Sequence, residues 1–240
     1  MGHKSISDLK SITREQLLGN YSRLSSYVIL YMLVSFTLMT LIGQVRLRGI
    51  AVELLLSLIY GFLIDIFTVG FIRVCRITIH GGTPVIKDFF YVLYHDPDKI
   101  IIISSISFLF TELVYLPFEV PSSVAAVIGL SGGVFFFLRC VLFACLIVVY
   151  VFAKILLSQC YYIYLDRPEC GALEILRISV TVMMKHKLRY FYLMFNVFGM
   201  SLLGVLTLGI GMIWIMPLNH VLMINFYEDL KGCSQTEYMV

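Results

Sequence analysis

Charged residues are scarce in this sequence of 240 residues, of which only 14% are Asp, Glu, Lys or Arg. A soluble globular protein usually carries about 25% charged residues and about 45–50% apolar residues. Here 60% of the residues are hydrophobic, and the mean hydropathy is +0.92. The composition therefore excludes an ordinary soluble protein and indicates one integral membrane domain over residues 1–240. The net charge of +3 gives no reason to expect a nucleic-acid partner.

The sequence also lacks the motifs of common enzymes and metal sites. It contains no H-E-x-x-H, no G-x-S-x-G and no phosphate-binding glycine loop. Its six cysteines form no C-x-x-C pair, and we interpret all of them as free thiols. The sequence "HDPD" that begins at His95 has metal-capable side chains, but so short a polar segment is usually a solvated turn. We expect no catalytic residue, no cofactor and no metal.

Long apolar runs take up most of the chain. A bilayer core about 30 Å thick is crossed by roughly 20 helical residues. Six stretches qualify, at residues 27–45, 51–71, 100–116, 134–157, 190–208 and 209–226. The expected fold is therefore all-α, a polytopic protein with six transmembrane helices that crosses the cell membrane several times. The last two stretches are separated only by the region around Gly209 and Gly211, which predicts a tight helical hairpin.

The positive charges predict the orientation of the spans, because Lys and Arg concentrate in cytoplasmic loops. The two terminal segments and the loops after the second and fourth spans hold 14 Lys and Arg residues. The other loops hold two, Arg46 and Arg48. We therefore expect both termini on the cytoplasmic side, with residues 1–26 as a cytoplasmic amphipathic segment.

Two loops on that side have helical periodicity and are expected to lie at the membrane surface, at about residues 83–95 and 170–188. In the first, Thr83 is the expected N-cap and Pro84 the first helical residue. Beside the second, Lys185, Lys187 and Arg189 form a candidate surface for anionic lipid headgroups. The alternative is a linker helix that packs on the bundle with a solvated polar face.

Four segments carry a resemblance to a known family. They are "LKSITREQLLGNY" before the first span, "YYIYLDRP", "SVTVMMKHK" and "LTLGIGMIWIMPLNHVLMINFYEDL". In this order they resemble the domain-of-unknown-function 975 family of bacterial integral membrane proteins. The family in turn distantly resembles the membrane domain attached to some glycerophosphodiester phosphodiesterases. The resemblance implies a helical membrane protein close to lipid, and it implies no activity.

Charged residues inside the spans are the strongest candidates for a site, because they are costly in the bilayer and usually pair or line a pathway. Asp65 and Lys154 lie at similar depth in the inner halves of the second and fourth spans. Glu112 and Arg139 lie near the outer ends of the third and fourth spans. Two structural ion pairs or one polar path through the bundle are the alternatives.

The last two spans add Asn196, Asn219 and His220, whose side chains can hydrogen-bond across helices. Pro217 removes a backbone donor from the final span. These residues indicate helix packing before they indicate a ligand site.

Two classes of function remain. One is a non-enzymatic bacterial membrane protein in transport, in lipid handling or as an accessory subunit of an envelope system. The alternative is a membrane-embedded enzyme that acts on lipid. The partner expected in either case is the lipid bilayer, including anionic headgroups, and the sequence indicates no protein partner or oligomeric state.

Overall fold

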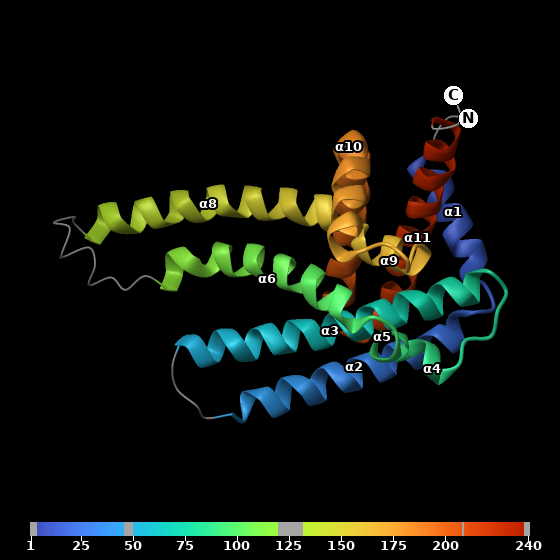
Figure 1. Cartoon of the computed structure of the whole chain (residues 1–240), viewed down its shortest axis with the longest axis horizontal. Coiled ribbons are helices and arrows are strands. Elements are labelled where there is room, and N and C mark those ends of the chain that lie inside the picture. Colours follow the sequence, from blue (N-terminus) through green and yellow to red (C-terminus); the bar gives the residue numbers. More distant parts are fainter. Residues whose placement is uncertain (1–3, 46–49, 120–131, 208, 238–240) are drawn as a thin grey trace.

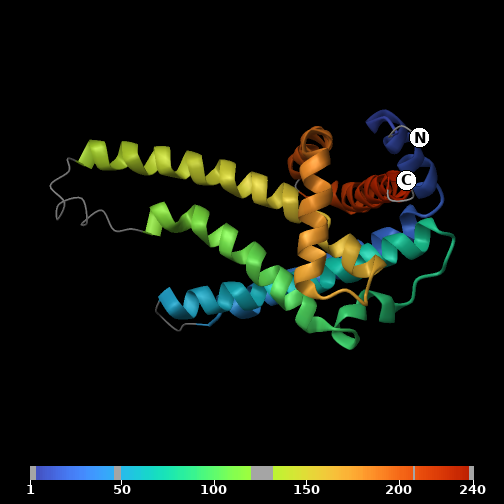
Figure 2. The same ribbon diagram turned by 45° about the horizontal axis from the view of Figure 1, so that its top comes forward.

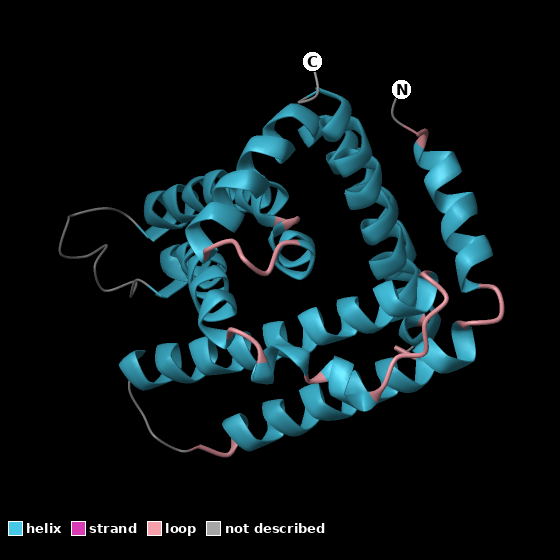
Figure 3. Cartoon of the chain, turned by 45° about the vertical axis from the view of Figure 1, so that its right-hand side comes forward, coloured by secondary structure: helices cyan, strands magenta, loops and turns pink. Residues whose placement is uncertain are grey.

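The computed structural model describes residues 4–45, 50–119, 132–207 and 209–237, and these residues form helices and loops without strands (Figure 3). Arg46, Arg48 and residues 120–131 lie outside the described residues. The helices are α1 (Ile6–Leu17), α2 (Tyr21–Gly43), α3 (Ile50–Ile79), α4 (Ile86–Phe89), α5 (Tyr91–Tyr94), α6 (Pro97–Glu119), α8 (Gly132–Leu157), α9 (Cys160–Asp166), α10 (Ala172–Leu206) and α11 (Met212–Glu237).

Four long helices lie side by side in the order α2, α3, α6 and α8 (Figures 1 and 2). At one end of this row, α10 crosses α8, and α11 packs against α1, α2, α3 and α10. The first and last helices are neighbours, and the Lys4 N–H donates to Asp229 Oδ1 over 3.2 Å. Both terminal segments therefore lie at the same end of the molecule.

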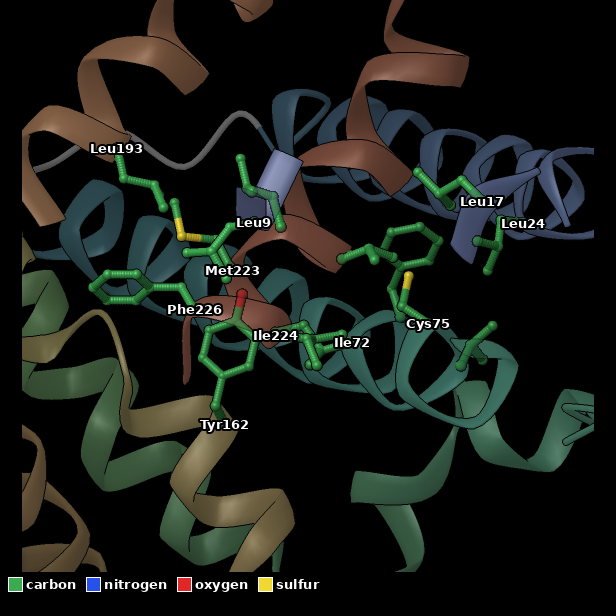
Figure 4. Close-up of a cluster of buried hydrophobic side chains, with 14 of the residues drawn as sticks. Leu9, Leu17, Leu24, Ile72, Cys75, Tyr162, Leu193, Met223, Ile224 and Phe226 are labelled. Carbon is green, nitrogen blue, oxygen red and sulfur yellow. The ribbon is translucent and has the colours of Figure 1, made fainter. Parts of the chain in front are cut away.

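The main hydrophobic core lies where α1, α2, α3, α9, α10 and α11 meet (Figure 4). Ile72 and Cys75 of α3 pack there with Leu9 of α1, Tyr162 of α9 and Phe226 of α11. All the described cysteine side chains are free, as predicted, and that of Cys233 lies outside the described side chains. This core ties segments far apart in the sequence into one body.

The far ends of the long helices expose large apolar side chains instead. Phe36 of α2 is 67% exposed and Phe137 of α8 is 65% exposed. Soluble proteins rarely expose contiguous apolar surfaces of this kind, whereas a bilayer accommodates them. By length and composition, four helical segments can cross a membrane, and they are Tyr21–Gly43, Val52–Ile79, Gly132–Asp166 and Ala172–Leu206. The all-helical fold is thus confirmed, and these apolar helices indicate a membrane protein.

The segment after α3 differs from the prediction. A single surface helix over residues 83–95 with Thr83 as its N-cap is wrong, because α4 begins at Ile86 and a break at Phe90 separates it from α5. Asp88 sets this start by accepting a hydrogen bond from the Val85 N–H over 2.9 Å. The chain then turns inward, and Phe89 is fully buried.

A glycine permits this inward turn. A Cβ at Gly70 of α3 would lie 1.8 Å from the carbonyl oxygen of Phe89. Only a residue without a side chain lets the two backbones approach so closely. The Phe89 ring also stacks on Phe67, with 5.7 Å between the ring centroids.

The two helices expected at residues 170–188 and 190–208 are present as the two parts of α10, which join at a kink. This helix has non-helical torsion angles at His186 (φ −116°, ψ 15°), where the chain kinks. The following hairpin is confirmed: Gly209 has φ +85°, and the Thr207 hydroxyl accepts the Gly211 N–H over 2.8 Å. Pro217 lies inside α11, as predicted.

Candidate functional site

A polar cleft of about 270 Å³ lies between α3, α6 and α8. These three helices are among the long ones that stand in one row, with α6 between the other two (Figure 1). The polar side chains that line the cleft are Ser57, Tyr60 and Asp65 of α3, Ser104, Ser107, Thr111 and Glu112 of α6, and Lys154 of α8. The cleft thus gathers three of the intramembrane charges that the sequence singled out.

Asp65 is half-buried and lines the cleft. The Ser104 hydroxyl of α6 donates a hydrogen bond to its Oδ2 atom. Ser104 is itself only 4% exposed, so this contact is shielded from the surroundings. The side chain of Tyr161, at the start of α9, interacts with the same carboxylate. Asp65 therefore connects α3 to α6 and α9.

Lys154 reaches the cleft from α8. Its Nζ atom donates to the Ser107 hydroxyl over 2.6 Å and lies 5.6 Å from the centroid of the Tyr150 ring. No direct ion pair joins Lys154 to Asp65 in the described part of the chain; each is bonded to a serine of α6. Asp65 and Lys154 are therefore not in direct contact, although their opposite charges interact across the cleft.

The other charged pair is placed differently. Glu112 lines the cleft on α6. Arg139 lies on α8, with its guanidinium 5.5 Å from the ring centroid of Phe135. Of the two, only Glu112 belongs to the cleft.

The polar residues of the last two spans lie outside the cleft, among helix contacts. Asn219 of α11 donates to the Ser201 hydroxyl of α10 over 3.3 Å. The His220 ring meets the Phe71 ring of α3 edge-on, with 5.3 Å between centroids. Asn196 is half-buried on α10. These contacts agree with a role in helix packing.

Of the three residues of the candidate headgroup surface, Arg189 has another role. Arg189 forms an ion pair of 2.7 Å with Asp229 and donates to the Lys4 carbonyl over 2.6 Å. The two side chains of the pair are only 17% and 7% exposed. Lys185 and Lys187 are exposed on α10 beside the kink. Arg189 therefore joins α10 to α11, and of the three residues only the two lysines are exposed.

A match to a protein family shows to which proteins the chain is related. Residues 1–234 match the family described as protein of unknown function (DUF975). The chain belongs to this family. No curated protein and no solved structure matches it.

Two groups of polar residues in this DUF975 chain were not predicted from the sequence. The first is the row of hydroxyls on α6, Ser104, Ser107 and Thr111. Their spacing of three and four residues places them on one face of a helix, and this is the signal that could have revealed them.

The second group surrounds Asp166 at the end of α9. Its Oδ1 accepts from Arg76 of α3 over 2.8 Å, and its Oδ2 accepts from Lys231 over 2.7 Å and from the Tyr227 hydroxyl over 3.1 Å. The donors come from α3 and α11, so their meeting point had no local signal in the sequence.

None of these groups makes a metal site. Among the described residues, no cluster of three or more His, Cys, Asp or Glu side chains can hold a metal ion. The cleft instead offers the carboxylates of Asp65 and Glu112, an ammonium group and hydroxyls, which suit a polar organic ligand.

Proposed function

We propose that this chain is a non-enzymatic protein of the bacterial cell membrane that binds a small zwitterionic solute in the cleft between α3, α6 and α8 and takes part in its transport. The supporting observation is that two opposite charges, Asp65 and Lys154, line one polar cleft and are bonded to serines and not to each other. A charge inside a membrane span is costly and is kept mainly where it pairs or serves a pathway.

The arrangement of the charges supports a ligand over a structural ion pair. Two opposite charges whose role is structural contact each other, because each then compensates the desolvation of the other. Here each charged group is bonded to a different serine, Ser104 or Ser107, one helical turn apart on α6, and the two groups are not bonded to each other. A solute with a cationic group near Asp65 and an anionic group near Lys154 would complete both sets of contacts. The volume of about 270 Å³ suits a small solute.

The proposal is tested with the purified chain in detergent and a panel of zwitterions, namely glycine, taurine, proline and glycine betaine, with uncharged glycerol for comparison. A ligand at about a hundred times its Kd stabilises the folded state by about 2.7 kcal/mol. We expect at least one zwitterion to raise the thermal midpoint and glycerol to leave it unchanged. We also expect proteoliposomes that contain the chain to take up the same zwitterion.

Single variants distinguish binding in the cleft from general effects of charge. Asp65→Asn and Lys154→Gln should abolish the shift in midpoint and the uptake. Glu53→Gln is the matched control, because Glu53 is exposed on α3 and does not line the cleft. A full shift in both cleft variants, or no shift with any zwitterion, would refute the proposal.

The proposed topology has six spans with both termini in the cytoplasm, and it takes α6 and α11 as spans in addition to the four apolar segments. Its support is the distribution of Lys and Arg and the packing of α1 on α11. Single cysteines in place of Ser7 and Lys185, in a chain without native cysteines, should react with an impermeant maleimide only in inverted vesicles. A cysteine at Gly133 should react only from the outside.

One contact favours a second candidate, an enzyme that acts on lipid. Ser107 Oγ lies 2.6 Å from Lys154 Nζ, and a serine next to a lysine base is the arrangement of some hydrolases. Such enzymes also need donors for the oxyanion of the intermediate. Ser107 lies inside α6, where the backbone N–H groups are used by the helix. A fluorophosphonate probe that labels the wild type and not Ser107→Ala would establish the enzyme; absence of labelling favours solute binding.

A further inference from the structure

A second cleft lies at the other end of α3, and its chemistry differs from that of the polar cleft. It has a volume of about 420 Å³ and is lined by Arg73, Arg76, Ile77, His80 and Leu165. The lining thus contains two guanidinium groups and an imidazole, and no carboxylate. We propose that this basic cleft binds a phosphate group, as carried by an anionic lipid headgroup or by free phosphate.

The acidic partners of the two arginines do not line the cleft and are more buried than the arginines. Arg73 Nε is 3.2 Å from Asp88 Oδ1, and Arg76 Nη2 is 2.8 Å from Asp166 Oδ1. Both arginine side chains are 32% exposed, whereas Asp88 is 18% and Asp166 only 6% exposed. The acids therefore fix the guanidinium groups from the buried side and leave them accessible from the cleft.

Each arginine keeps donors for a ligand. The hydrogen bond to its aspartate uses one N–H group of the guanidinium, and the remaining N–H groups stay available. Arg73 also lies over the Tyr91 ring, with 3.8 Å from its Cζ atom to the ring centroid, which holds the planar group in one orientation. Because Arg73 and Arg76 are three residues apart on a helix, they project to the same side. Two fixed guanidinium groups that face one cleft match the oxygens of a phosphate.

The remaining walls suit a headgroup position. His80 is held at the end of α3 by a 2.8 Å contact of its Nδ1 atom with the Arg76 carbonyl and lies 3.3 Å from Glu228 through Nε2. Ile77 and Leu165 supply the apolar part of the lining. The arginines follow directly on the apolar run that ends near residue 71, which is the level at which headgroups meet a spanning helix.

The position is separate from the polar cleft. Arg73 is eight residues beyond Asp65 on the same helix, or about 12 Å at 1.5 Å per residue. The two clefts share no lining residue. Loss of solute binding and loss of phosphate binding are therefore distinguishable by variants of different residues.

The test uses the purified chain in non-ionic detergent with two probes, inorganic phosphate and dioleoyl phosphatidylglycerol. Binding of the lipid is followed by native mass spectrometry, and binding of phosphate by the thermal midpoint. The key variant is Arg73→Gln/Asp88→Asn, which removes a guanidinium and its acid together and leaves the net charge unchanged. We expect it to weaken binding at least about tenfold, the loss expected for one charge-assisted hydrogen-bonded group.

Two further variants test whether binding depends on the guanidinium group of Arg73. Arg73→Lys keeps the charge and the contact with Asp88 but not the planar fork, so it should bind more weakly than the wild type and fold normally. Arg177→Gln is the control, because Arg177 is exposed on α10 and does not line the cleft. It should bind like the wild type.

The two probes identify the source of the phosphate. Binding of both probes, lost in the double variant, assigns the cleft to the phosphate group itself, and binding of the lipid alone assigns it to a headgroup. The proposal is overturned if the wild type binds neither probe, or if Arg73→Lys and the double variant both bind as tightly as Arg177→Gln.

Discussion

Asp166 is the side chain whose removal should affect the stability of the fold most directly. It joins three helices, because Arg76 of α3 and Lys231 and Tyr227 of α11 all donate to its carboxylate at the end of α9. Asp166→Asn keeps the size of the side chain and removes the charge. Both cations then lose their acid, while the amide retains a single oxygen to accept hydrogen bonds.

The expected magnitude follows from the burial of the partners. Removing one member of a buried ion pair costs about 3–5 kcal/mol. The Asp166 side chain is only 6% exposed, but Arg76 is 32% and Lys231 is 37% exposed. Solvent can therefore compensate part of the stranded charge, and exposed pairs are worth roughly 0–1 kcal/mol. We expect a loss of about 2 kcal/mol, between these limits.

The assay is thermal unfolding of the purified chain in detergent. For a chain of this size, 1 kcal/mol corresponds to about 2–4 °C in the midpoint, so Asp166→Asn should unfold about 4–8 °C below the wild type. Glu169→Gln is the matched control, since Glu169 is exposed only three residues away and its loss should cost within about 0.5 kcal/mol. Equal midpoints for Asp166→Asn and Glu169→Gln would refute the reasoning that this cluster holds α3, α9 and α11 together.

Two further predictions concern close packing and a buried charge. Gly70→Ala should destabilise the fold by about 1–3 kcal/mol, because its Cβ would lie 1.8 Å from the backbone oxygen of Phe89, whereas Gly61→Ala on the same helix meets nothing within 4 Å and should be neutral in thermal unfolding. Arg189→Gln should cost about 2 kcal/mol by removing the positive charge that faces Asp229, which is 7% exposed, and an unchanged midpoint would mean that this ion pair does not hold α10 to α11.

The sequence by itself determined the class of the protein and the position of its apolar helices. The length of an apolar run is a local property, and a bilayer accepts only segments that satisfy their own backbone, so such runs must become helices. The hairpin around Gly209 was also predictable, because its glycines are a local signal for a turn between two apolar runs. The candidate charges Asp65 and Lys154 also came from the sequence, because a charge is conspicuous within an apolar run.

Only the tertiary structure decided which side chains meet. Asp65 and Lys154 contact Ser104 and Ser107 and not each other, because α6 lies between the helices that carry them. Arg189, placed by its neighbours in sequence on a lipid surface, pairs instead with Asp229. Partners of this kind depend on how helices are rotated and where they cross, and residues far apart in the chain set both. No local pattern contains that information, so the polar cleft and the basic cleft became visible only when the helices were packed together.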